Sequence, residues 1–115
     1  MARYRLSGLA KADIAAILKT SREQHGEQAR IRYRALLTAA LRRIANNPGG
    51  VSTLDRAELL PGIRSFHIRH SRSDSNEASV AYPVHVIFYR VSEQDVIDIV
   101  RVLHERMEPS RHLGN

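Results

Sequence analysis

Cysteine is absent from this chain of 115 residues. Its absence excludes disulfide bonds, thiolate nucleophiles and cysteine-based zinc sites, and it fits a reducing compartment. No apolar run approaches the roughly 20 residues of a membrane-spanning helix. The N-terminal stretch MARYRLSGLAKAD also lacks the hydrophobic core of a secretion signal. We therefore expect a soluble, cytoplasmic protein that folds as a single domain over residues 1–115.

Acidic side chains are scarce in the N-terminal part of the chain. Residues 1–47 hold ten Lys and Arg against three Asp and Glu, whereas residues 48–115 hold eight against nine. The net charge of +6 therefore arises from the first part. This imbalance indicates an anionic partner, either nucleic acid or an acidic protein segment, and a solvated helix surface is the alternative.

Two amphipathic helices are predicted in this basic part, at about 9–24 and 27–46, because apolar residues recur there at helical spacing. His25-Gly26 separates them, and Asn46-Asn47-Pro48 ends the second. Two such helices joined by one turn predict an antiparallel hairpin. The stripe positions are Ala10, Ile14, Ile17, Leu18 and Ser21 in the first helix and Ala29, Tyr33, Leu36, Leu37, Ala40, Leu41 and Ile44 in the second.

Strands are predicted where apolar residues alternate or where β-branched and aromatic residues gather. We expect 82–91 to be a central strand buried on both faces, followed by a turn at Ser92–Asp95. Residues 48–62 are expected to form a loop with at most one helical turn near 56–60, and the polar stretch 71–79 to lack regular structure. This order predicts an α+β fold with the helical hairpin packed on a small antiparallel sheet. The expected strands are 3–7, 63–70, 82–91 and 96–103.

Five stretches of the sequence are distinctive in combination: LAKADIAAI at 9–17, ALRRIANNP at 40–48, GIRSFHI at 62–68, VIFYRV at 86–91 and IVRVLHERMEPSRHL at 99–113. Together they resemble the RelE/ParE superfamily of bacterial toxins, and they favour its ParE-like branch. The resemblance covers nearly the whole chain. A long polar insertion, His70–Ala81, departs from the family pattern and could alter partner contacts on that edge.

This resemblance implies the toxin of a type II toxin–antitoxin system. RelE-type members cleave mRNA on the ribosome, whereas ParE-type members inhibit DNA gyrase, and a cognate antitoxin holds both inactive. For this chain the resemblance implies two partners, DNA gyrase and a ParD-like antitoxin, and no cofactor.

The residue types favour inhibition by binding over RNA cleavage. Attack of a 2′-hydroxyl needs a base, an acid and cations around the phosphorus. Arg64 occupies one strand position that is basic in RelE-type toxins, but Phe66 and Val86 occupy two others and can neither transfer a proton nor stabilise the added charge. The tail has no Tyr. We therefore assign no catalytic residue, and a RelE-like endoribonuclease is the alternative.

Metal binding is not expected, although the chain has six histidines. His67 and His70 are three residues apart in a predicted strand and therefore point to opposite faces. His104 and His112 lie in the tail without a carboxylate at ligand spacing. His85 alternates with valines on a central strand, which favours a hydrogen-bonded structural role.

A DNA-binding helix-turn-helix, or an adaptor module, is a further alternative, because Arg30, Arg32 and Arg34 open the second helix. The predicted helices are longer than the usual unit of this motif, and the sheet would have no role. We instead expect the hairpin to bind an acidic, amphipathic antitoxin segment. The expected antitoxin contacts are Ile14, Ile17, Arg30, Arg34, Leu37 and Arg42.

The C-terminal tail, residues 103–115, is the expected contact with the target. The core is expected to close at Leu103, so truncation after Met107 should leave a folded protein. A charged arm at the end of a rigid strand can reach a large partner. The expected target contacts are His104, Arg106, Arg111 and His112, together with Arg64.

Overall fold

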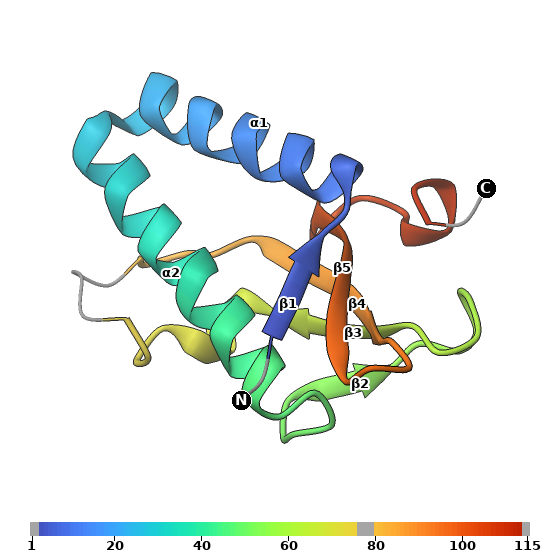
Figure 1. Cartoon of the computed structure of the whole chain (residues 1–115). Helices are drawn as coiled ribbons and strands as arrows, with labels where there is room; N and C mark the ends of the chain where they lie inside the picture. The colour runs from blue at the N-terminus through green and yellow to red at the C-terminus, as the bar shows by residue number, and fades with distance from the viewer. Residues whose placement is uncertain (1–2, 76–79, 114–115) are drawn as a thin grey trace.

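Two helices cover one face of a five-stranded sheet in this protein (Figure 1). The computed structural model describes residues 3–75 and 80–113. Of the polar stretch 71–79, Ser71 belongs to a short 3-10 helix, residues 72–75 belong to no helix or strand, and 76–79 lie outside the described residues. The elements are β1 (Arg3–Leu6), α1 (Gly8–His25), α2 (Glu27–Asn46), β2 (Thr53–Asp55), β3 (Arg64–His67), the 3-10 helix η1 (Ile68–Ser71), β4 (His85–Val91), β5 (Val96–His104) and the 3-10 helix η2 (Pro109–Arg111).

The helical hairpin forms where the sequence predicts it. The hydroxyl of Ser7 accepts a hydrogen bond of 3.0 Å from the Ala10 amide, and this cap satisfies a free donor at the start of α1. Gly26 has a φ of 93°, which a residue with a side chain rarely adopts, and it therefore joins the two helices without a longer loop.

The sheet has the strand order β1-β5-β4-β3-β2. Neighbouring strands are antiparallel except β1, which runs parallel to β5, so the sheet is mixed rather than antiparallel. The predicted α+β architecture is confirmed with this difference. The α1–α2 hairpin separates β1 from the rest of the sheet in sequence, and this long connection allows a parallel pairing.

Two details of the middle region differ from the expectation. Residues 48–62 contain the short strand β2, which was not expected. The single turn expected near 56–60 does form, because the Leu59 and Leu60 amides both donate hydrogen bonds to the Arg56 carbonyl. The predicted strand at 63–70 ends at His67, because its side chain accepts a hydrogen bond from the Arg69 amide and starts η1 instead. A local side-chain bond of this kind competes with the ladder of a sheet.

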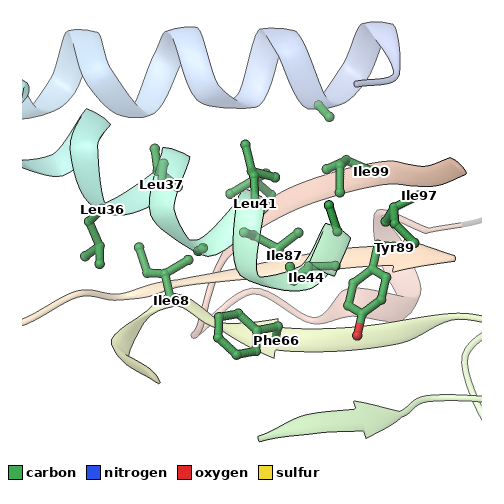
Figure 2. Packing of buried hydrophobic residues seen from close by; sticks show 14 of the residues in the cluster. Leu36, Leu37, Leu41, Ile44, Phe66, Ile68, Ile87, Tyr89, Ile97 and Ile99 are labelled. Carbon is green, nitrogen blue, oxygen red and sulfur yellow. The ribbon is translucent and has the colours of Figure 1, made fainter. Parts of the chain in front are cut away.

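The main core lies between the sheet and the helices (Figure 2). β4 is the middle strand and is buried on both faces, as predicted, because Ile87 and Tyr89 face the helices while Phe88 faces the other side. The residues of α2 that pack on this face are Tyr33, Leu36, Leu37, Ala40, Leu41, Ile44 and Ala45.

A second, smaller core lies on the opposite face of the sheet and includes the C-terminal tail. Leu113 is 5% exposed and packs with Ile63, Phe88 and Leu103. The expectation that the core closes at Leu103 is therefore wrong, since the tail folds back through η2 and buries a leucine. One apolar residue in a polar segment produces no periodic pattern, so the sequence carried little signal for this contact.

Candidate functional site

A cleft of about 700 Å³ opens between the α1–α2 hairpin and the end of the sheet where β4 begins and β5 ends. Ile17 and Tyr33 line it from the helices, and Val84 lines it from the segment before β4. Tyr82 and Met107 also line it, and they are 87% and 46% exposed. Large apolar side chains beside a concave surface are typical of a protein-docking site.

The inner part of the cleft is polar and is built around Tyr33 and His85. The Tyr33 hydroxyl lies 2.6 Å from His85 Nδ1, and it accepts a hydrogen bond of 3.1 Å from the Val84 amide. Since the amide can only donate, the hydroxyl proton is free to be donated to Nδ1. This pairing holds the neutral His85 ring in the tautomer that carries its proton on Nε2.

Burial keeps His85 neutral. It lowers the pKa of His85 to about 4, and the neighbouring His104 and His67 add to this effect because they disfavour a further positive charge. Burial likewise raises the pKa of Tyr33. The hydrogen-bonded structural role predicted for His85 is confirmed.

His104, at the end of β5, completes the polar part of the cleft. Its ring lies edge-on to that of His85, with 5.5 Å between centroids. Its Nδ1 accepts a hydrogen bond of 3.1 Å from the Arg106 amide, which turns the chain away from the sheet. The next residue, Glu105, lies 2.6 Å from His67 Nε2, and this hydrogen bond lowers the pKa of its carboxyl. The ionisable groups that follow Leu103 thus fix how the last strand ends.

A second network connects α1, β5 and the tail. Arg101 donates two hydrogen bonds of 2.8 Å to the Asp13 carboxylate and one of 3.0 Å to the His112 carbonyl. Asp13 also accepts a hydrogen bond from the Val102 amide. It thereby satisfies a backbone donor of β5 beyond Ile99, where the pairing with β1 ends at Leu6. The side chains of Arg101 and Asp13 are only 16% and 15% exposed. Such a shielded, bidentate pair holds its geometry better than an exposed one.

The predicted target contacts do not form one cluster. His104 lines the cleft, and Arg106 and Arg111 are exposed. His112 is half-buried beside the second core. Arg64 lies at the opposite end of β3 from His67 and donates to the Pro48 carbonyl and the Thr53 hydroxyl, which gives it a structural role away from the tail.

The predicted antitoxin contacts are also divided. Ile17 lines the cleft, whereas Arg34 and Arg42 line a separate hollow of about 730 Å³ on the outward face of α2. Ile14 is half-buried against the core, and Arg30 forms an ion pair with Glu27 at 2.7 Å.

The expectation for Leu37 is corrected by its burial. Leu37 is 2% exposed within the main core, so it has no surface to offer a partner. The helical pattern identified it as apolar but could not distinguish the face against the sheet from an exposed apolar face.

A family model described as the ParE toxin of the type II toxin–antitoxin system parDE matches residues 4–109. The chain belongs to the ParE toxin family. Toxin ParE1 of Mycobacterium tuberculosis, in strains CDC 1551 / Oshkosh and H37Rv, is 32% identical over 111 residues, which cover 96% of this chain and 97% of that toxin. Toxin ParE1 of Caulobacter vibrioides is 33% identical over 114 residues, which cover 99% and 100%.

The sheet of this ParE-family chain positions few groups suited to RNA cleavage. Phe66 is buried in the main core and Val86 packs at the edge of the second.

Among residues 3–75 and 80–113, no three His, Asp or Glu side chains gather in a way that could hold a metal ion. No helix in the described part of the chain is long and apolar enough to cross a membrane.

Sequence reasoning missed the cleft itself. The helical pattern places Tyr33 in the apolar stripe of α2, yet its hydroxyl contacts a histidine 52 residues later in the sequence. The sequence pattern predicts a buried strand that includes Tyr82, yet β4 begins only at His85 and leaves Tyr82 exposed. A Tyr in an apolar helical stripe is the only available signal, because a buried hydroxyl needs a polar partner.

Proposed function

We propose that this ParE-family toxin inhibits DNA gyrase by binding and is neutralised by a ParD-like antitoxin that docks in the cleft. The observation that carries the antitoxin proposal is the cleft, which combines exposed Tyr82 and Met107 with the apolar wall at Ile17 and Val84. An amphipathic segment of the antitoxin would bury its apolar side chains there.

Charge supports an acidic occupant. Arg32 and His25 line the cleft, and the helices that form it belong to the basic part of the chain. Exposed ion pairs each contribute only about 0.2–1 kcal/mol, so apolar contacts should supply most of the affinity. The charges, including Arg34 and Arg42 farther along α2, should mainly accelerate association with an acidic segment.

Inhibition of gyrase without chemistry is supported by the tail and by the poor fit of the sheet to catalysis. Arg106 and Arg111 are exposed on a segment that is held in place by Leu113 and by the bond between Arg101 and the His112 carbonyl. An arm fixed at both ends presents its cations in a defined arrangement, which lowers the entropy cost of binding.

Co-expression tests the toxin–antitoxin proposal. The chain is induced alone and then together with the protein encoded by the adjacent reading frame. We expect growth arrest in the first case and recovery in the second, with the two proteins purifying as a complex. A Tyr82→Glu, Met107→Glu double variant should arrest growth but escape neutralisation. Full neutralisation of this variant would place the antitoxin elsewhere.

A further inference from the structure

Two histidine N–H groups inside the cleft have no protein partner among the described residues. Nδ1 of His104 accepts a hydrogen bond from the Arg106 amide. Nδ1 of His85 is paired with the Tyr33 hydroxyl, and we assign the hydroxyl as the donor because it already accepts the Val84 amide. The neutral ring of each must then carry its proton on Nε2. Both residues line the cleft, and neither Nε2 has a hydrogen bond within residues 3–75 and 80–113.

Apolar side chains line the cleft beside these donors. The two rings are 5.5 Å apart and nearly perpendicular, with Ile17 and Val84 in the same cleft. A purely apolar partner that filled the cleft would cover two N–H groups without replacing their hydrogen bonds to water, at a cost in affinity. A carboxylate has two oxygens that only accept and would satisfy both donors.

We propose that His85 and His104 form a carboxylate-binding site in the cleft and select an occupant that carries an Asp or Glu beside apolar side chains. This inference rests on the proposed docking of the antitoxin in the cleft and names the chemical group that anchors it. His85 and His104 are thus specificity-determining residues of the docking site.

The charged groups around this site favour a carboxylate and make its binding depend on pH. His25 and Arg32 line the cleft from the helices, and His67 approaches from β3. Glu105 is the opposing charge with the larger effect on His85, but it is engaged by His67. Asp13 is likewise engaged, by Arg101. A bound carboxylate raises the pKa of His85 from its value of about 4, so carboxylate affinity should rise as the pH falls.

Phenylacetate is a suitable probe, because it joins a carboxylate to an apolar ring, and phenylacetamide is its neutral counterpart. Binding to the full chain is followed by the NMR chemical shifts of backbone amides and histidine rings. We expect phenylacetate to shift the His85 and His104 ring signals and to bind about tenfold more tightly than phenylacetamide, as loss of a charge-assisted hydrogen bond would give. Lowering the pH from about 7.5 to about 5.5, where an ordinary carboxyl stays ionised, should strengthen only phenylacetate binding.

Three variants make the test specific. His85→Phe and His104→Phe each keep a ring but remove the donor, and each should reduce phenylacetate affinity to that of phenylacetamide. His70→Phe, a matched change outside the cleft, should bind phenylacetate as the unmodified chain does. If His85→Phe does not fold, His104→Phe alone decides the outcome. Equal affinity for the two probes, or shifts confined to His25 and Arg32, would overturn the proposal.

Antitoxin capture separates this inference from the docking proposal. The protein from the adjacent reading frame is tested for binding to the His104→Phe variant and to the Tyr82→Glu, Met107→Glu variant. Weakened capture of both supports the carboxylate site. Capture weakened only by the Tyr82 and Met107 changes leaves docking in the cleft intact and overturns the histidine anchor. Capture that neither variant weakens overturns both proposals.

Discussion

The hydroxyl of Tyr33 on α2 lies 2.6 Å from Nδ1 of His85 on β4, and it is the polar link between the helical layer and the sheet at the cleft. The same hydroxyl accepts a hydrogen bond from the amide of Val84, the residue just before β4. The cleft therefore has a fixed inner wall, although Tyr82 and Met107 at its opening are exposed. A rigid wall with an open rim suits recognition of one segment.

Removal of this hydroxyl should destabilise the fold. In Tyr33→Phe the Val84 amide and His85 Nδ1 both lose their partner at a partly buried position. We expect a loss of about 1–3 kcal/mol in the free energy of unfolding. Urea denaturation measures it, with Tyr82→Phe as the control, because that exposed side chain should change stability by less than about 0.5 kcal/mol. An unchanged free energy of unfolding in Tyr33→Phe would show that water replaces the hydroxyl.

Stability should fall in acid because of His85. Its pKa is about 4 in the folded chain and about 6.5 in the unfolded chain, so the unfolded state binds the proton more readily. The stabilising contribution is complete above pH 6.5 and is lost as the pH falls toward 4. Solvent screening at this partly open site reduces the effect to the order of 1–2 kcal/mol.

Urea midpoints measured between these two pH values should decline for the unmodified chain and decline less for His85→Phe. Glu105 also contributes to acid sensitivity. Its hydrogen bond with His67 lowers the pKa of its carboxyl in the folded chain, so protonation of that carboxyl in acid weakens the bond. Glu105→Gln is therefore measured alongside. If the decline is unchanged in His85→Phe and abolished in Glu105→Gln, the acid sensitivity belongs to the His67–Glu105 pair instead.

The tail should have separable structural and contact roles. Leu113→Ala removes a buried side chain from the second core and should cost about 2–3 kcal/mol. Truncation after Met107 removes the same side chain, so it should yield a folded but less stable protein. Arg111→Glu changes only an exposed side chain and should leave the melting temperature nearly unchanged. Thermal melts of the three variants check this order, and an unstable Arg111→Glu would contradict it.

Charge reversal on the outward face of α2 should slow antitoxin association. Arg34→Glu with Arg42→Glu removes two exposed cations, and the association rate at low salt should fall more than the dissociation rate changes. Arg72→Glu with Arg90→Glu changes the net charge equally elsewhere on the surface and serves as the control. Stopped-flow measurement of antitoxin association at two ionic strengths distinguishes the effects of the two double variants. Equal slowing by both pairs would indicate a general effect of net charge.

Local features of the sequence predicted the helices and the last hairpin well. Gly26 separates two helices because few other residues adopt its backbone conformation, and the turn at Ser92–Asp95 joins β4 to β5 as expected. These features depend on neighbouring residues, so one sequence is sufficient to recognise them.

Contacts between residues far apart in the sequence could not be predicted from local features. The parallel partner of β1 is separated from it by most of the chain, and β2 has only three residues. The cleft depends on Tyr33 meeting His85, and the buried position of Leu113 depends on a tail that reverses direction. Each of these arises from tertiary packing, which overrides local propensity.

Supercoiling of relaxed plasmid by purified gyrase tests the central proposal most directly. The chain should block supercoiling at concentrations near that of the enzyme, and the protein from the adjacent reading frame should restore it. Arg111→Glu should remain folded and fail to block. Unimpaired supercoiling, combined with discrete mRNA cuts in primer extension after induction, would contradict the account and identify an endoribonuclease.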